Sequence, residues 1–360
     1  MDKPTVDAYE QQAARWESER TVDEPELAAA FARRVGGEGV RLDVGCGPGW
    51  YAPLLGGQVI ASDAAFSMLK IAVLGAEGAP LVQHDFEALP FRSDRISGIW
   101  AHKCLMHVPH ESLPMVLHEI ARVLQVGGAV QARILSDRLQ RTWQADPYGQ
   151  RHFSLWNEGH LRRVFDGAGF TIEDCEHRHG QWLDISATRQ RTLADVVGPS
   201  MNVLVVGLNP SVYSADRGVA FARPGNRFWP AALLSRLVTA DRDPVHALRH
   251  RGVGFTDIVK RATARADELV RDEYEAGVER LRELVEWLEP KVIAFLGVTG
   301  YRVAVDRHAS LGIQPTDFGG AATYVMPNPS GLNAHTNVTD LVGHFQSVAR
   351  LASSVASASR

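Results

Sequence analysis

The sequence predicts an α/β protein made of two domains in tandem, each built around a central sheet with helices on its faces. The chain has 360 residues, more than the roughly 250 at which a single hydrophobic core stops growing. Short apolar runs alternate with amphipathic helical patterns along its whole length. One series of these patterns closes near residue 189, and a second series starts at residue 201. We therefore expect a Rossmann-like sheet in the first half and an α/β/α domain with a central parallel sheet in the second.

These patterns place a first domain at residues 1–188, a polar linker at 189–200, a second domain at 201–352 and a flexible tail at 353–360. The three cysteines are too far apart for a disulfide framework or a metal cluster, so we expect reduced thiols and no metal. Neither a signal peptide nor a run of about 18–20 apolar residues is present. We therefore expect a cytoplasmic monomer without a membrane partner.

The strands of the first domain are short apolar runs that end at turns or glycines. A helix is expected to stop at Gly127-Gly128 before a strand at 127–135, and another helix is expected to stop at Gly169. The remaining strands are expected at 40–45, 58–63, just before Asp85, at 98–102, after Gly169 and within 179–189.

A glycine-rich turn, LDVGCGPG, follows the first of these strands. Gly45, Gly47 and Gly49 let the backbone approach a ligand that any Cβ would block. Their spacing, G-x-G-x-G, is one residue shorter than the G-x-G-x-x-G fingerprint of dinucleotide-binding domains. Asp63 ends the second strand, where a carboxylate can accept both hydroxyls of a ribose. Asp85 follows the third strand, in reach of an adenine edge.

This half resembles the class I S-adenosylmethionine-dependent methyltransferases of the small-molecule type. LDVGCGPG matches their first motif, SDAAFSMLKIA the second and HDFEALPFRSD the third, over roughly residues 35–185. The resemblance implies a seven-stranded sheet and S-adenosylmethionine as the cofactor. The residues that it implies for cofactor binding are Asp43, Gly45, Gly47, Gly49, Asp63 and Asp85.

The resemblance leaves the methyl acceptor unknown, and small-molecule, RNA and protein acceptors all stay open. His102, Lys103 and His107 lie where such folds present residues to the substrate. A nicotinamide-binding domain or a non-catalytic Rossmann domain is the alternative interpretation of the same glycine-rich turn.

The second domain begins with MNVLVVGLNP at residues 201–210, which is too apolar for a half-exposed strand and predicts a central parallel one. Residues 273–290 form an amphipathic helical pattern, followed by a strand at 291–297. Residues 323–335 predict a strand that opens into a loop, and a closing helix follows.

The first of these strands stops at Asn209-Pro210, which forces a turn and places the Asn side chain at the carboxyl edge of the sheet. Active sites of open α/β sheets lie at that edge. Downstream, Tyr213, Phe221, Phe228 and Trp229 supply aromatic faces on which an extruded base can stack. Arg217, Arg223 and Arg227 supply cations for phosphates.

Two later segments fit the same interpretation. Lys260, Arg261 and Arg265 lie on a predicted loop that could follow a nucleic-acid backbone. Leu332 lies at the tip of the loop in MPNPSGLNAH, where an exposed Leu is costly unless it inserts into a partner such as a duplex with a flipped base. Residues 201–360 hold 18 Lys and Arg against 16 Asp and Glu, a balance of +2, whereas residues 1–200 hold 20 against 26, a balance of -6.

The second half resembles the mismatch-specific uracil/thymine-DNA glycosylases of the uracil-DNA glycosylase superfamily. GLNPS, FARPGNRFW, GVGFTDIVKRAT and NPSGL match in order over residues 201–350. The resemblance implies that Asn209 positions the hydrolytic water, Phe221 stacks on the flipped base and Ser214 lines its pocket. It implies a wedge formed by Asn328, Ser330, Gly331 and Leu332, with Leu332 filling the vacated stack. Asn333-Ala334-His335 follow the wedge where the family has Ser-Arg.

These resemblances predict a monofunctional DNA glycosylase of base-excision repair fused to a methyltransferase. The expected partner is double-stranded DNA with a G·U or G·T mispair, with adducted pyrimidines as further candidates, and the glycosylase is expected to need no cofactor. Two alternatives stay open. The second domain either only binds nucleic acid and delivers the methyltransferase to it, or is a decayed glycosylase.

Overall fold

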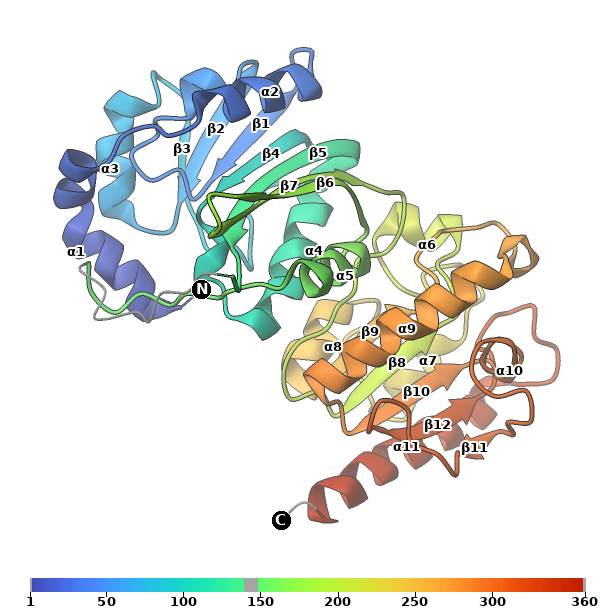
Figure 1. Cartoon of the computed structure of the whole chain (residues 1–360). Helices are drawn as coiled ribbons and strands as arrows, with labels where there is room; N and C mark the ends of the chain where they lie inside the picture. The colour runs from blue at the N-terminus through green and yellow to red at the C-terminus, as the bar shows by residue number, and fades with distance from the viewer. Residues whose placement is uncertain (1, 139–147, 359–360) are drawn as a thin grey trace. The chain divides into compact units, whose positions relative to one another are not determined.

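The computed structural model describes residues 2–138 and 148–358, which form two compact α/β units, Met1–Gln190 and Arg191–Arg360 (Figure 1). The first unit contains a sheet of seven strands and the second a sheet of five. The predicted fold class is therefore confirmed. The boundary between the units falls at the start of the segment predicted as a linker.

The seven-stranded sheet has the order β3-β2-β1-β4-β5-β7-β6, and β7 runs antiparallel to both of its neighbours. Because the first five strands are parallel, their carboxyl ends meet at one edge of the sheet, which is where ligands bind in such folds. The strands are β1 (Val40–Val44), β2 (Gln58–Asp63), β3 (Leu81–Gln83), β4 (Ile96–His102), β5 (Leu124–Leu135), β6 (Phe170–Arg178) and β7 (Trp182–Arg189).

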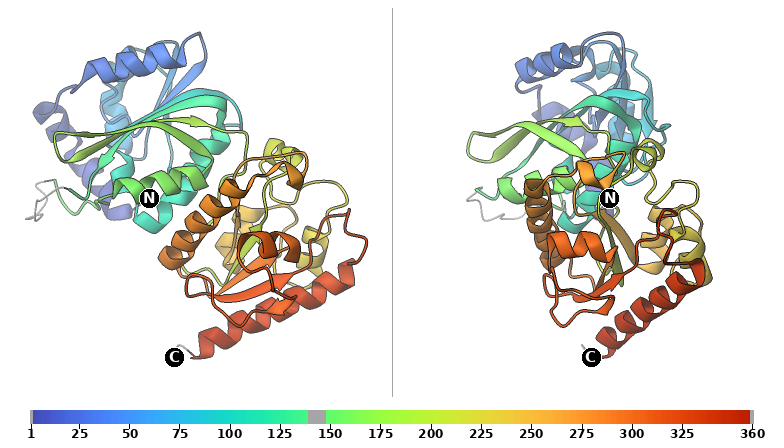
Figure 2. Two further views of the ribbon diagram at one scale, coloured as in Figure 1. Left: turned by 45° about the vertical axis from the view of Figure 1, so that its right-hand side comes forward. Right: turned by 90° about the vertical axis from the view of Figure 1, so that its right-hand side faces the viewer.

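Helix α2 lies on one face of this sheet, where Phe31 packs on Trp100 of β4, and α4 and α5 cover the other face (Figures 1 and 2). Helix α1 packs along α3. The helices are α1 (Lys3–Glu19), α2 (Pro25–Val35), α3 (Phe66–Gly75), α4 (Leu113–Val123) and α5 (Glu158–Gly167), with single 3₁₀ turns at Ala52–Leu54, Leu105–His107 and His110–Ser112.

One predicted boundary in this unit is wrong. The helix expected to stop at Gly127-Gly128 is α4, which already ends at Val123, and β5 starts at Leu124. Leu124 pairs with Ile96 of β4, and the register shifts before Gly98 pairs with Ala129. The two glycines therefore lie within an irregular stretch of a strand, a position that glycine also favours.

The five-stranded sheet has the order β11-β12-β10-β8-β9, parallel except for the short edge strand β11. All five residues of β8 are buried, which confirms the predicted central parallel strand. The strands are β8 (Val203–Gly207), β9 (Val253–Asp257), β10 (Val292–Leu296), β11 (Gly312–Ile313) and β12 (Ala322–Met326).

Helices α9 and α10 pack on one face of this sheet, and α7 and α11 pack on the other (Figure 1). The predicted amphipathic helix is α9, which buries Leu281, Val285 and Leu288 as its spacing requires. No helix of the described residues has the length and apolar content that a membrane span needs. The helices are α6 (Val212–Arg217), α7 (Phe228–Leu234), α8 (Pro244–Arg251), α9 (Arg271–Leu288), α10 (Val298–Ala304) and α11 (Val338–Ala358), with a 3₁₀ turn at Ala266–Glu268.

The segment expected to be a linker is structured, and so are the described residues of the expected tail. Val196 pairs with Phe255 of β9 through two backbone hydrogen bonds of 2.9 and 2.8 Å. Asp195 is buried and forms ion pairs with Lys260 (2.6 Å) and Arg280 (2.9 Å). Helix α11 continues through Ala358, so the expected tail is helical up to that residue.

Candidate active sites

Asn209 lies two residues beyond the end of β8 and is held by the loop that follows β9. Its Nδ2 donates to the carbonyl oxygen of Arg261 (3.0 Å) and to Oγ1 of Thr263 (2.8 Å). Because a backbone carbonyl can only accept, these bonds fix which end of the amide is the donor. The Oδ1 atom accepts no hydrogen bond from a described residue and is the acceptor that this side chain offers at the sheet edge.

Thr263 is a site residue that sequence reasoning missed. It is buried, and its hydroxyl donates to the carbonyl oxygen of Arg265 (2.7 Å) while accepting from Asn209. The hydroxyl is therefore a fixed acceptor for the Asn209 amide. Thr263 is the last residue of the matched GVGFTDIVKRAT segment, so a residue-by-residue comparison of that motif could have identified it.

The cations of the same loop are already paired with carboxylates. Lys260 is bound to buried Asp195, Arg261 to Glu273 (2.6 Å) and Arg265 to Asp267 (2.5 Å). The predicted role of Lys260 along a nucleic-acid backbone does not fit, since its ammonium group lies inside the protein. The loop instead binds the side-chain amide of Asn209, through the carbonyl oxygen of Arg261 and the hydroxyl of Thr263.

Phe221 has a backbone φ of 56°, a left-handed conformation that is rare for a bulky residue. Such strain persists only where the surroundings hold it, and it concentrates at functional sites. The ring stacks on Phe228 with centroids 4.5 Å apart. The buried Ser214 hydroxyl accepts from the amide of Ala222 (3.3 Å) and thereby anchors the chain next to Phe221.

Asp257, at the end of β9, is a second residue that sequence reasoning missed. It pairs with Gly207 across the sheet, and a Cβ on Gly207 would collide with its Oδ1 and lie 3.6 Å from Phe221 Cζ. The Asp257 carboxyl and the Phe221 ring therefore both border Gly207 at the end of β8. Burial raises its pKa to about 6, together with the nearby Asp195 carboxylate and against the opposing charges of Lys260 and Arg280.

The wedge loop, residues 328–336, is organised by its own side chains. Asn328 Oδ1 accepts from the amide of Ser330 (2.9 Å), and Ser330 Oγ accepts from the amide of Leu332 (3.3 Å). A Cβ on Gly331 would lie 2.7 Å from the carbonyl oxygen of Gly225, so the loop approaches the neighbouring turn closely. Leu332 is 83% exposed. The loop thus presents an apolar side chain to solvent on a preformed backbone.

Arg227 holds the wedge loop instead of being free for a phosphate. Its guanidinium donates to the carbonyl oxygens of Asn333 (2.9 Å) and Thr336 (2.7 Å), and its own amide donates to that of Pro329 (2.9 Å). The expectation that Arg227 serves the DNA backbone directly is therefore replaced by a positioning role.

Replacing Arg227 with methionine is expected to loosen the wedge loop. Hydrogen bonds to a charged group are worth about 1.5–3 kcal/mol, so we expect amide exchange at residues 328–336 to become at least about tenfold faster. Hydrogen–deuterium exchange measures this effect. Arg223→Met, on the same turn but exposed, is the matched control and should leave exchange in the loop unchanged.

In the first unit the glycines that follow β1 have separate tasks. All three have positive φ, of 65° at Gly45, 52° at Gly47 and 79° at Gly49. A Cβ on Gly45 would lie 2.5 Å from that of Cys104, whereas one on Gly47 would have no neighbour within 4 Å. Gly45 is thus required by packing, and Gly47 faces open space in which a ligand has room.

Two carboxyls border this turn, the buried Asp43 and the half-buried Asp63. Asp63 accepts from the amides of Gly47 and Ala65, both at 2.9 Å. Asp43 is buried, and its Oδ2 has no hydrogen-bond partner among the described residues. Burial raises the pKa of Asp43 to about 8, with a contribution from the Asp63 charge, and raises that of Asp63 to about 6. A cationic ligand beside these two carboxyls would favour their ionised forms and lower both pKa values.

Asp85 lies apart from these carboxyls in its contacts. It is exposed and accepts from the amide of Glu87 (3.0 Å). The described contacts therefore bring Asp63 together with Gly47 but do not include Asp85. No group of three or more His, Cys, Asp or Glu side chains suited to a metal ion occurs in residues 2–138 and 148–358.

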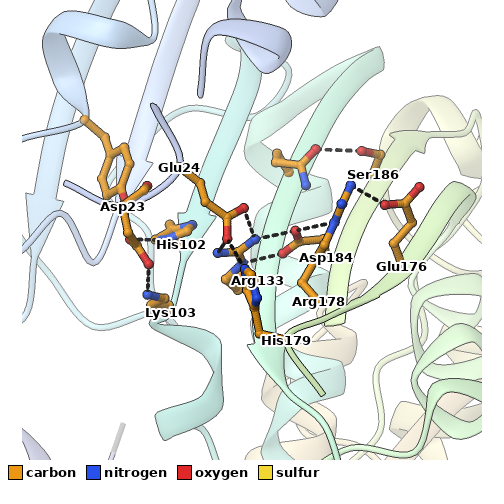
Figure 3. Close-up of polar contacts among 12 residues, drawn as sticks. Asp23, Glu24, His102, Lys103, Arg133, Glu176, Arg178, His179, Asp184 and Ser186 are labelled. Carbon is orange, nitrogen blue, oxygen red and sulfur yellow. Dashed lines mark hydrogen bonds and ion pairs between the residues drawn. The ribbon is translucent and has the colours of Figure 1, made fainter. Parts of the chain in front are cut away.

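A polar cluster lies where β4, β5 and β7 pair (Figure 3). Asp23 accepts from His102 Nε2 (3.2 Å) and is bonded to Lys103. Burial opposes its charge, but these donors hold the pKa of Asp23 well below its usual range. Arg133 lies between Glu24 and Asp184, as Figure 3 shows.

Of the three residues expected to face the substrate, His102 and Lys103 thus form hydrogen bonds to Asp23, which lies in the connection between α1 and α2. His107 is buried and bonded to the hydroxyl of Tyr9 (2.8 Å) on α1.

Comparison with known proteins agrees with this division of the chain. Residues 194–347 match the family model of the uracil DNA glycosylase superfamily, and residues 42–131 match that of a methyltransferase domain.

Solved structures also resemble the chain. A Burkholderia thailandensis 1,6-didemethyltoxoflavin-N1-methyltransferase is 21% identical, with a TM-score of 0.42, over 51% of this chain and 85% of its own. DhpI in complex with S-adenosylhomocysteine is 18% identical, with a TM-score of 0.44, over 53% and 99%. The [4+2]-cyclase SpnF is 20% identical, with a TM-score of 0.38, over 46% and 80%. By its two family matches, the chain joins a methyltransferase domain to a domain of the uracil DNA glycosylase superfamily.

Proposed function

We propose that the second unit is a DNA glycosylase that removes uracil mispaired with guanine, with thymine and adducted pyrimidines as further substrates. The observation that carries this proposal is the clamped amide of Asn209, whose Nδ2 is held by Arg261 and Thr263. Its Oδ1 is left to hold a water molecule at the carboxyl edge of the sheet. The exposed Leu332 on the wedge loop supports the proposal independently.

The proposed reaction starts with extrusion of the base, which costs a few kcal/mol and least for a mispair. The base stacks on Phe221 while Leu332 fills the gap in the duplex. The C1′–N1 bond breaks with its electron pair going to the base, which leaves as an anion. The water held by Asn209 bonds to C1′ and releases its proton to solvent, because an amide is not a base. Asn209 therefore contributes position more than proton transfer.

Asp257 is proposed to serve the leaving base. In its neutral form it can donate a hydrogen bond to a carbonyl oxygen of the pyrimidine on Phe221 and stabilise the developing anion. The ionised form would repel the same oxygen. Because its pKa is raised to about 6, we expect excision to fall as the pH rises from 5 to 8.

The pH profile of single-turnover G·U excision tests this role. At pH 8 only about 1% of a group with a pKa near 6 is protonated, so we expect a loss of up to about 100-fold between pH 5 and 8. Asp257→Asn keeps a neutral donor of the same shape and should flatten the profile. A wild-type profile that the substitution leaves unchanged would contradict the proposed role of Asp257.

The overall glycosylase proposal is tested by incubating the full chain with duplexes that carry G·U, G·T or A·U pairs, followed by alkaline cleavage. We expect strand cleavage with G·U ahead of A·U. Salt-dependent duplex binding without cleavage would contradict the proposal and support the alternative, a domain that only binds nucleic acid.

For the first unit we propose S-adenosylmethionine-dependent methyl transfer. The support is a pair of carboxyls, the buried Asp43 and the half-buried Asp63, beside the open backbone at Gly47. Asp63 would hold the ribose, and Asp43, whose Oδ2 has no hydrogen-bond partner among the described residues, would face the positive charge of the cofactor. The cofactor would supply the methyl group.

Calorimetric titration of the full chain with S-adenosylmethionine tests this assignment. We expect saturable binding that Asp63→Ala weakens at least tenfold, since the loss of a charge-assisted hydrogen bond costs about 1.5–3 kcal/mol. Exposed Asp216→Ala in the second unit is the control and should bind like the wild type. Absence of binding to the wild type would overturn the assignment.

A further inference from the structure

We propose that the first unit holds a cationic nitrogen of its methyl acceptor, a guanidinium or an alkylammonium group, in a cage of aromatic rings. The inference rests on the methyl transfer proposed above and adds the chemical class of the acceptor. In this structure the guanidinium of the chain's own Arg151 occupies the cage.

Four rings surround the guanidinium carbon of Arg151 within the range of cation–π attraction, which extends to roughly 6 Å. It lies 4.9 Å from the ring centroid of Tyr148, 5.0 Å from that of Phe153 and 5.4 Å from those of Tyr9 and Trp16. Cages of several aromatic rings are used by proteins to recognise cationic ligands such as quaternary ammonium groups.

The rings form one continuous wall. Trp16 contacts Tyr148 (5.0 Å between centroids) and Tyr9 (5.3 Å). His107 joins Tyr9 (5.4 Å) to Phe153 (4.9 Å). The wall is thus built from α1, from the turn after β4 and from residues 148–153, three segments that are distant in sequence.

A chain of hydrogen bonds makes the cage selective for a cation that carries N–H groups. His107 Nδ1 lies 2.7 Å from the carbonyl oxygen of His152 and must therefore be the protonated ring nitrogen. Nε2 then accepts from the Tyr9 hydroxyl (2.8 Å), whose oxygen accepts from Arg151 Nη1 (3.0 Å). The Tyr9 oxygen is consequently an oriented acceptor inside the cage.

The cage borders the residues assigned to the cofactor. Tyr9 and Trp16 pack with buried Ala65 and Met68 at the start of α3. The amide of Ala65 donates to Asp63 (2.9 Å), the residue expected to hold the ribose. A cation bound in the cage would therefore lie beside the proposed methyl donor.

Arg151 acts in this proposal as an internal occupant that the acceptor displaces. A tethered group competes at an effective concentration in the millimolar range, so wild-type protein should bind a free cation weakly. Removing the Arg151 charge should free its place among the four rings and strengthen that binding, while Arg20 stays over Trp16 and Arg15 over Tyr148.

Saturation-transfer NMR of the full chain with methylguanidinium as the probe tests the cage without any methyl transfer. We expect Arg151→Gln to bind the probe at least about tenfold more tightly than the wild type. Arg151→Lys, which keeps a cation in place, should bind like the wild type, as should the control Arg92→Gln on the exposed surface. Adding Trp16→Ala to Arg151→Gln should abolish the gain.

A second measurement needs no variant. Millimolar methylguanidinium should speed amide exchange at residues 148–153 of the wild type as Arg151 leaves the cage. No gain of binding in folded Arg151→Gln, or no change in this exchange, would overturn the proposal and leave Arg151 as a structural clamp. Failure of S-adenosylmethionine to bind would instead overturn the methyl transfer itself, so the two failures are distinguishable.

Discussion

Replacing Asn209 with alanine is expected to lower the rate of uracil excision from a G·U duplex by at least about 100-fold. The substitution removes the Oδ1 atom that is proposed to hold the attacking water. The surrounding loop keeps its other contacts, because Thr263 still bonds to Arg265 and its amide still donates to the carbonyl oxygen of Pro210 (3.1 Å). DNA binding should therefore persist while the chemical step is lost.

Single-turnover cleavage and fluorescence anisotropy measure these two effects separately. Asn202→Ala is the matched control, because this Asn precedes β8 at the opposite edge of the sheet and bonds to Lys291 (2.8 Å). It should leave excision unchanged. Undiminished cleavage by Asn209→Ala would contradict the proposed role of the residue, even if the wild type excises uracil.

Replacing Asp195 with alanine is expected to destabilise the second unit by about 3–5 kcal/mol. Asp195 is the shared partner of Lys260 and Arg280, whose side chains are only 9% and 6% exposed. It also accepts from the hydroxyl of Thr256 (2.6 Å) on β9. Its removal leaves two buried cations without their carboxylate, which costs far more than the loss of an exposed ion pair.

Native-state hydrogen exchange at the amides of β8 and β9 measures the unfolding free energy of this unit within the full chain. Asp216→Ala is the control, since its pair with Arg191 is about half exposed and solvent screens the two charges, so its loss should change the unfolding free energy little. Burial opposes the charge of Asp195, but Lys260 and Arg280 keep its pKa below the ordinary value. The contribution is therefore present above roughly pH 4 and lost as the pH falls further. A loss below 1 kcal/mol in Asp195→Ala would contradict this account.

Sequence reasoning located the features that depend on local chemistry. A strand buried on both faces must be apolar at every position, and so β8 could be recognised and placed at the centre of its sheet. The Asn-Pro turn marked Asn209 as a candidate at the sheet edge. The glycine-rich turn after β1 marked the ligand side of the first unit, because positive φ angles need glycine there.

The same reasoning misjudged residues whose partners are distant in sequence. Residues 189–200 looked like a polar linker, but Asp195 finds Arg280, 85 positions away, in the core of the second unit. Arg227 looked like a phosphate ligand, but it bonds to Thr336, 109 positions away. In the sequence, a charged residue that is exposed to solvent cannot be told from one that is paired inside the protein. The difference lies in its counter-charge or carbonyl partner, which is distant along the chain.

The sequence by itself thus determined the two α/β units, their order and the turns that carry the candidate site residues, since periodicity and turn chemistry are local properties of the chain. Only the tertiary structure decided which side chains complete the sites. Thr263 binds Asn209 across 54 positions, Asp257 lies beside Gly207 from a neighbouring strand, and the four rings around Arg151 come from α1 and from residues 148–153. Such groups are assembled by strand order and helix packing, and no spacing along the chain records them.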